Sequence, residues 1–261
     1  MTQDKGHKML NTSRLFMTGI FLAGLAVSSN SFSSEPTAEE ILKDADRGRG
    51  SSAVTDGIAW DVIVESNDGS TQNSLTYAVK VKGADALAEA TAPARNKGET
   101  MLFNDRNIWF FKPGLKKPVA ISPRQKLMGQ ASNGDIASTN YARDYEGTIS
   151  GSEKVDGQDT WKIELKAKAK NVTYDRIRYW VSKKDRVGIK ADFLTVGGDL
   201  FKKATFEYKN KLNAGGKQIP FVSKMTITDA VNANAKTILN YKSPKPSKLP
   251  DATFNVNNLV R

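Results

Sequence analysis

Residues 101–129 read MLFNDRNIWFFKPGLKKPVAISPRQKLMG, and this stretch decides the fold. Four large apolar residues, Ile108 to Phe111, precede a turn at Pro113 and Gly114 and a second short apolar segment. Alternate side chains of a strand point to opposite faces, so four consecutive apolar residues place apolar groups on both faces. One face would meet the ordinary core. The other would meet either more core or a ligand, and the pattern leaves both open.

Most of the remaining chain alternates between apolar and polar residues with a period of two. The alternation is clearest at residues 75–81, 160–166, 189–193, 204–208 and 219–227. Turn sequences rich in Gly, Asn and Asp separate these runs at residues 67–69, 156–157, 183–185, 197–199 and 213–216. Such a pattern predicts antiparallel strands with one solvent-facing side, joined as successive hairpins.

Many consecutive hairpins form either two packed sheets or one sheet curled into a barrel. Only one strand face is consistently apolar, and about two helices are expected, which suffices to cover a concave sheet. One of them spans residues 37–46, after Pro36, with acidic residues in its first turn and Gly48 beyond its end. We therefore expect a mostly β protein in which one antiparallel sheet is curled and helices cover its concave side.

The first 34 residues have the layout of a secretory signal peptide. Lys5, Lys8 and Arg14 precede an apolar run at 15–27, and small residues follow. The apolar run is shorter than the roughly 20 residues of a membrane-spanning helix, although a retained anchor is the alternative reading. We expect a leader at residues 1–34 and a single domain at 35–261. Because the chain has no Cys, we expect an unlipidated periplasmic protein without disulfides.

The chain is basic, with a net charge of +11. The leader holds three basic residues and one acidic residue, so the remainder keeps about +9. This surplus suits a partner with acidic head groups, such as anionic lipid or a membrane surface. Nucleic acid is disfavoured because the basic residues are spread over many strands. The alternative is that the charge only keeps the protein in solution.

The sequence offers little for catalysis. His7 is the only histidine and lies in the leader, and there is no Cys. The domain therefore has no imidazole for a catalytic triad or zinc site and no thiol nucleophile. No Ser is followed three residues later by Lys. We expect no enzymatic activity, no metal and no cofactor.

Residues 129–145 read GQASNGDIASTNYARDY, a composition typical of loops. They form either a connector or a lid that opens when a ligand enters. Trp180 shares a strand face with Arg176 and Arg178. That face is either a wet surface where the indole stacks on an arginine or the mouth of a site for a lipid with an acidic head.

Several motifs together resemble the LolA-like outer-membrane lipoprotein-sorting protein family. They are residues 93–98 (PARNKG), 109–113 (WFFKP), Lys116-Lys117, Ile121-Ser122, 127–129 (LMG), 153–157 (EKVDG) and 179–181 (YWV), with Phe254 and Leu259 near the end. The similar branch is often found beside lipid-exporting membrane permeases. The sequence departs from the family after Met128-Gly129, where relatives tend to carry an aromatic and acidic motif.

The resemblance implies an incomplete antiparallel β-barrel with an N-terminal helix and a short lid helix over an apolar cavity, and this cavity would receive acyl chains. Strand aromatics are commonly core residues, and each could instead line that cavity. Our candidate cavity residues are Trp60, Trp109, Phe111, Leu127, Met128, Trp161, Phe193, Phe206 and Phe221. Our candidate contacts to an acidic head group are Lys116, Lys117, Arg176 and Arg178.

Two functions remain open. The first is a periplasmic carrier that takes a lipid or the acyl chains of a lipoprotein from the inner membrane towards the outer membrane. The second is an envelope adaptor that docks on a lipid-exporting permease and carries no cargo. For the carrier we expect a monomer, a permease partner and transient membrane contact.

Overall fold

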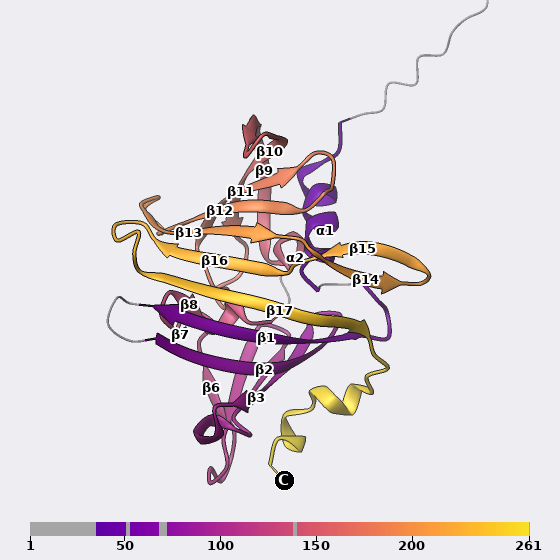
Figure 1. Ribbon diagram of the computed structural model, residues 1–261, viewed down its shortest axis with the longest axis vertical. Helices are drawn as coiled ribbons and strands as arrows, with labels where there is room; N and C mark the ends of the chain where they lie inside the picture. Colours follow the sequence, from indigo (N-terminus) through magenta and orange to yellow (C-terminus); the bar gives the residue numbers. More distant parts are fainter. Residues whose placement is uncertain (1–34, 51–52, 68–71, 138–139, 261) are drawn as a thin grey trace, which may run out of the picture. The chain divides into compact units, whose positions relative to one another are not determined.

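One antiparallel sheet of thirteen strands forms most of the protein (Figure 1). From edge to edge its order is β6 (Val119–Ile121), β5 (Asn107–Phe111), β4 (Thr100–Asn104), β3 (Asp85–Ala92), β2 (Gln72–Lys82), β1 (Ile58–Asn67), β17 (Lys236–Pro246), β16 (Lys224–Asp229), β13 (Leu200–Glu207), β12 (Gly188–Leu194), β11 (Arg176–Ser182), β10 (Gln158–Ala167) and β9 (Tyr145–Val155). Among the strands that the structure describes, the edge strands β6 and β9 do not pair with each other, so the sheet is not closed.

Smaller elements complete the fold. Two further strand pairs are β14 (Asn210–Ala214) with β15 (Lys217–Phe221) and β7 (Lys126–Met128) with β8 (Ala131–Ser132). The helices are α1 (Ala38–Arg47) and α2 (Tyr141–Asp144), and short 3₁₀ turns are η1 (Ala94–Asn96), η2 (Asn133–Asp135), η3 (Asp251–Phe254) and η4 (Val256–Asn258).

The computed structural model describes residues 35–261 except 51–52, 68–71, 138–139 and 261. The predicted leader at residues 1–34 lies outside the described residues. Pro36–Arg261 form one compact unit.

Helix α1 begins shortly after Pro36, as the sequence predicts, and a capping box holds its first turn. The Thr37 hydroxyl accepts from the Glu40 amide at 3.2 Å, and the Glu40 carboxylate accepts from the Thr37 amide at 2.8 Å. These two bonds satisfy amide groups that the start of a helix would otherwise leave unpaired. The apolar stripe of Ile41, Leu42 and Ala45 is buried in the main core.

The alternation of the strands places one face of the sheet inside. In β1, Trp60, Val62 and Val64 are buried, whereas Asp61 between them is exposed. The inner side chains of the other long strands join the same core cluster. A single curved sheet with one apolar face thus replaces the alternative of two packed sheets, and the expected incomplete barrel with covering helices is confirmed.

The sheet curls far enough for its two halves to touch. Arg106 lies in the turn between β4 and β5, and Asp144 is the residue before β9. Arg106 Nε donates to Asp144 Oδ1 at 3.0 Å. Asn171, beyond β10, contacts Asn107 at 3.5 Å. Contacts between elements so distant in the sheet order require a concave inner face.

Residues 121–137 and 140–144, the covering segment, lie across this concave face. Ala131 and Ile136 are completely buried, and the Gln130 amide donates to Thr237 Oγ1 at 2.7 Å. The reading of residues 129–145 as a mere connector is therefore wrong, because a connector would be exposed. Its polar residues are turn and cap residues: Asp135 accepts from the Ser132 amide at 2.8 Å.

The alternating run 219–227 is two strands rather than one. Ile219 and Phe221 belong to β15, which pairs only with β14, and Met225 and Ile227 belong to β16 in the large sheet. The break falls at Val222, whose amide donates to the Gly48 carbonyl at 2.8 Å. The strand β15 thus ends where the chain contacts the end of α1. The local sequence does not predict this break.

The outer face of β4 and β5 is covered by the C-terminal residues. Phe254 is buried there with Leu102 and Leu249, and Trp109 and Leu259 pack around them. Phe254 and Leu259 thus anchor the C-terminal residues on the sheet.

Gly129 allows the covering segment to approach the sheet closely. Its φ is +55°, and a Cβ at this position would collide with the side chains of Ser66 and Thr237. We expect Gly129→Ala to lower the free energy of unfolding by about 2–4 kcal/mol, because it adds crowding to a left-handed backbone.

Gly215→Ala is the matched control, with φ +59° and open space around a Cβ. It should cost only the left-handed term of about 1–2 kcal/mol. Urea melts of both variants measure the difference, and equal losses would show that the covering segment does not depend on this close approach.

Candidate functional site

The inner face of β2, β4 and β5 forms one wall of a pocket. Leu75 and Tyr77 come from β2, Met101 from β4 and Phe110 from β5. Strand β3 lies between β2 and β4, with Ala90 opposite Tyr77 and Ala88 opposite Met101. Both alanines are completely buried, so the larger side chains of β2, β4 and β5 form this wall of the pocket.

The covering segment forms the opposite wall, with Ile121 from β6 and Leu127 from β7. The two walls enclose the apolar pocket, a volume of about 540 Å³. This is within the range of pockets that bind small molecules, roughly 300–1,000 Å³. Polar side chains complete the lining: Asn96, Glu99, Gln125, Lys126 and Asn133. Gln125 and Lys126 are exposed, which places the entrance of the pocket beside them.

Both walls of the apolar pocket carry apolar side chains, and its charged lining residues are Glu99 and Lys126. Burial, together with the Glu99 carboxylate, raises the pKa of Tyr77 to about 12, so its phenol is neutral at pH 7. The pocket can thus hold an uncharged chain among aliphatic and aromatic side chains, with a polar group at the entrance near Lys126.

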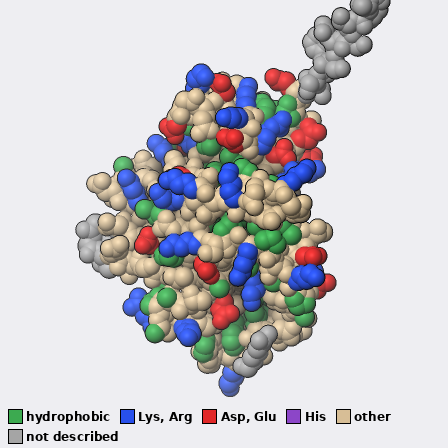
Figure 2. Space-filling view, turned by 45° about the vertical axis from the view of Figure 1, so that its right-hand side comes forward, with side chains coloured by type: hydrophobic (Ala, Val, Ile, Leu, Met, Phe, Trp, Pro, Cys, Tyr) green, Lys and Arg blue, Asp and Glu red, His purple; other side chains and the backbone are tan. Residues whose placement is uncertain are grey.

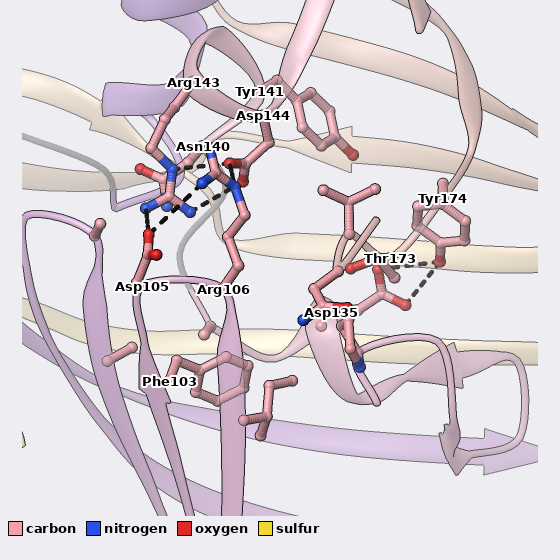
Figure 3. A pocket seen from close by; sticks show the side chains of 18 of the residues that line it. Phe103, Asp105, Arg106, Asp135, Asn140, Tyr141, Arg143, Asp144, Thr173 and Tyr174 are labelled. Carbon is pink, nitrogen blue, oxygen red and sulfur yellow. Dashed lines mark hydrogen bonds and ion pairs between the residues drawn. The ribbon is translucent and has the colours of Figure 1, made fainter. Parts of the chain in front are cut away.

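A second, polar pocket of about 80 Å³ lies beside α2, at the end of the covering segment (Figure 3). Arg106 and Arg143 both donate to Asp144 Oδ1, at 3.0 and 2.8 Å, and Arg143 also pairs with Asp105 at 3.6 Å. Figure 3 shows these four side chains converging from the β4–β5 turn and from α2. Their charges balance, so the cluster ties the two elements together rather than offering a free charge.

Asp135 and Tyr174 form the other side of the polar pocket. Tyr174 Oη donates to Asp135 Oδ2 at 2.8 Å, and the Tyr174 ring stacks on Phe193 with centroids 3.8 Å apart. Burial raises the pKa of the Asp135 carboxyl. The contact joins the covering segment to the far half of the sheet.

A buried arginine lies beside this pocket. Arg49 is 5% exposed, and its guanidinium carbon is 4.5 Å from the centre of the Phe206 ring and 5.6 Å from that of Tyr141. Burial acts to lower the pKa of Arg49, but the phenols around it, Tyr141 first, raise it above its ordinary value. The guanidinium thus stays charged and is held by aromatic faces.

Asp46 joins α1 to α2. Its Oδ2 accepts from the Ala142 amide at 2.9 Å, and the carboxylate is 4% exposed. Burial raises the pKa of Asp46 to about 7, although the Ala142 and Tyr141 amides and Arg49 all act to lower it. The Asp46 carboxyl, which links the N-terminal helix to the covering segment, therefore ionises near neutral pH.

The structure distributes the predicted cavity residues over three places. Leu127 lines the apolar pocket, and Met128 lies beside it, next to Gly129. Trp60, Trp161, Phe193, Phe206 and Phe221 are buried in the main core and line neither of the two pockets above. Trp109 lies on the outer face, packed under the C-terminal residues. Phe111 shares the parity of Trp109 and is absent from both linings.

The face of β5 that meets the pocket is the one with Ile108 and Phe110. Sequence reasoning favoured Trp109 and Phe111 and missed Phe110, Met101, Leu75 and Tyr77. Leu75 and Tyr77 were visible as one side of an alternating strand. In β5, four consecutive residues are apolar, so the sequence does not show which alternate pair faces inward. Only the pairing of Phe110 with Met101 selects the inner face.

The predicted head-group residues do not come together. Lys116 and Lys117 are exposed in the turn between β5 and β6, and Arg176 is exposed at the start of β11. Arg178 is paired with Glu164 at 2.9 Å and with Asp192 at 3.8 Å. Trp180 is buried on that outer side, with Lys190 Nζ 4.0 Å from its ring centre and a hydrogen bond to Glu153.

In the described part of the chain, no helix has both the length and the apolar composition that crossing a membrane requires. No group of three or more His, Cys, Asp or Glu residues is placed there to hold a metal ion. The face in Figure 2 carries Lys and Arg side chains interspersed with Asp and Glu, without one continuous basic patch.

Solved structures with this open sheet define the class of protein. A LolA superfamily protein from Nitrosomonas europaea is 30% identical, with a TM-score of 0.75 over 85% of this chain and 99% of its own. A domain from Vibrio parahaemolyticus named for outer membrane lipoprotein sorting is 22% identical, with a TM-score of 0.71 over 86% of this chain and 98% of its own. A DUF1329 family protein from Desulfovibrio piger is 21% identical, with a TM-score of 0.71 over 85% and 97%.

The chain belongs to the LolA superfamily. A family model described only as that of an uncharacterized protein matches residues 82–261. No curated protein matches the sequence.

Asp46 predicts how stability depends on pH. Its pKa is about 7 in the folded protein against about 3.8 for a free side chain, so the folded state holds a proton that the unfolded state releases. Its contribution is therefore most favourable below pH 4 and is lost as the pH rises from about 4 to about 7. Asp46→Asn keeps an oxygen for the Ala142 amide and removes this loss.

We expect Asp46→Asn to match the wild type near pH 4 and to exceed its free energy of unfolding at pH 8 by about 1–4 kcal/mol. Urea melts at several pH values compare the two proteins. A variant less stable than the wild type at pH 8 would show that attraction between ionised Asp46 and Arg49 outweighs burial.

Proposed function

We propose that the protein is a periplasmic carrier that binds the acyl chains of a lipid or lipoprotein and takes them from the inner towards the outer membrane. The observation that carries this proposal is the apolar pocket of about 540 Å³, whose two walls carry aliphatic and aromatic side chains beside polar ones. An acyl chain buries apolar surface there, with a gain of about 0.8 kcal/mol per buried CH₂ group.

Three further features support the proposal. The chain belongs to the LolA superfamily, and one similar domain is named for outer membrane lipoprotein sorting. Residues 1–34 have the pattern of an export leader, and without Cys the exported protein would not be lipidated. A carrier needs no catalytic group, and in this proposal the protein is a monomer and not an enzyme.

The cover of the pocket suits exchange of cargo. The covering segment is held by hydrogen bonds such as Gln130 to Thr237 and by charged contacts around Asp144 and Asp46. Contacts of this kind can re-form with water when the segment moves, whereas an apolar core would resist opening. An inner-membrane lipid-exporting permease would supply the cargo.

Phe110 and Phe111 provide a matched test, because they are adjacent, identical and similarly half-buried but face opposite sides of β5. Phe110→Glu places a carboxylate in the apolar pocket and should weaken the binding of a long-chain fatty acid by about tenfold or more. Phe111→Glu should change it less than about threefold. Fluorescence titration with a conjugated fatty acid measures both, and urea melts control for folding.

Native mass spectrometry of the protein, purified after export and without detergent, tests cargo directly. A bound lipid or acylated peptide is the expected result. A bare protein that also takes up no fatty acid on titration would overturn the carrier proposal and favour the adaptor.

A further inference from the structure

Two neighbouring turns expose apolar side chains at one end of the sheet. Six large apolar side chains are exposed in the described part of the chain, and four of them lie on or beside the β12–β13 and β16–β17 turns. These four, the apolar tip, are Val196 at 67% exposure, Leu200 at 37%, Phe201 at 36% and Val231 at 95%. Both turns are on the left-hand side of Figure 1.

The apolar tip is one surface. The Ala230 amide donates to the Phe201 carbonyl at 3.1 Å, so the residue before Val231 is bonded to the β13 side of the other turn. Lys202 pairs with Asp229 in the register of β13 and β16. Exposed apolar groups that gather in this way mark interaction sites more often than isolated ones do.

Both turns are held in shape by their own hydrogen bonds. Asp229 Oδ1 accepts from the amides of Val231 and Asn232, each at 2.9 Å. In the other turn the Thr195 amide donates to the Asp199 carbonyl at 2.9 Å, and the Asp199 amide to Thr195 Oγ1 at 3.1 Å. The valines are therefore presented to solvent by ordered backbone, and both turn carboxylates face the turns themselves.

Basic residues surround the apolar tip. Arg176 and Lys236 are exposed at the first positions of β11 and β17, next to the two turns, and Lys203 is exposed within β13. Lys202 Nζ is 5.7 Å from the centre of the Phe201 ring. The only acidic side chains within the two turns are Asp199 and Asp229, which the turns use. Apolar groups ringed by cations complement a surface that is apolar beneath a layer of anionic phosphates.

The entrance of the apolar pocket is at the same end. Lys126 lines both that pocket and a neighbouring one that includes Ala235 and Lys236, the residues that lead from the β16–β17 turn into β17. Lys202 Nζ also lies 3.4 Å from Ser132 Oγ of the covering segment. A surface docked at the apolar tip would thus lie next to the pocket entrance.

We propose that the apolar tip inserts into the surface of a bilayer that contains anionic phospholipid. The valines and Phe201 enter the boundary between head groups and acyl chains, and the surrounding lysines and Arg176 bind phosphate. Membrane docking is a property of the protein without cargo. That it serves cargo exchange rests on the proposed carrier function.

Flotation with lipid vesicles tests the proposal with the protein purified after export. The wild type should float with vesicles of phosphatidylcholine mixed with phosphatidylglycerol at low salt, and weakly with phosphatidylcholine alone or at high salt. The double variant Val196→Asp, Val231→Asp should reduce the bound fraction about tenfold. The control Val119→Asp, Val260→Asp changes two exposed valines elsewhere and should stay within about twofold of the wild type.

Charge reversals separate a local from a general effect of charge. Lys203→Glu, Lys236→Glu should abolish the preference for phosphatidylglycerol, whereas Lys116→Glu, Lys117→Glu makes the same change in net charge in the β5–β6 turn and should keep it. Equal loss in both pairs would overturn the assignment to the apolar tip.

Two other results would also overturn the proposal. One is equal flotation of the wild type and the Val196→Asp, Val231→Asp variant. The other is retention only on membrane vesicles that contain their native proteins, which would assign the apolar tip to a protein partner. Fatty-acid titration of the tip variant keeps the two proposals distinct, because its pocket is intact and its binding should match the wild type.

Discussion

The apolar inner face of an open sheet is the constraint on which the rest of the structure depends. Thirteen strands share one face lined by residues such as Val62, Val79 and Ile163, and the edge strands leave it unclosed. Water must be excluded from this face, since its burial is the main driving force for folding. Helix α1 and the covering segment, which includes α2, form the second layer that covers this face.

The two halves of the sheet meet this requirement differently. Around β11, β12 and β13 the protein fills the concavity with its own rings, among them Phe193, Tyr179 and Phe206, with Tyr174 stacked on Phe193. Around β2, β4 and β5 the apolar pocket of about 540 Å³ remains between the sheet and the covering segment. The concavity is thus filled in one half of the sheet and partly open in the other.

Charged groups lie where α1 meets the covering segment. Burial of these charges costs free energy because they lose their contact with water. Arg49 is held by aromatic faces, and Asp46 has its pKa raised to about 7 by burial. Such contacts stabilise less than apolar packing of the same area would. They concentrate at the cover, whereas the sheet behind it is apolar and continuous.

The sequence by itself determined the strands, the start of α1 at Thr37, the single apolar face and the poverty of catalytic groups, because each depends on local spacing or composition. The tertiary structure alone decided which face of Ile108 to Phe111 turns inward, since both faces are apolar and only pairing with Met101 separates them. It also decided that the loop-like composition at 129–137 becomes part of a cover over the sheet, with Ala131 and Ile136 completely buried. The pocket is lined by residues of β2, β4, β5 and the covering segment that meet only in the folded chain, which no local pattern encodes.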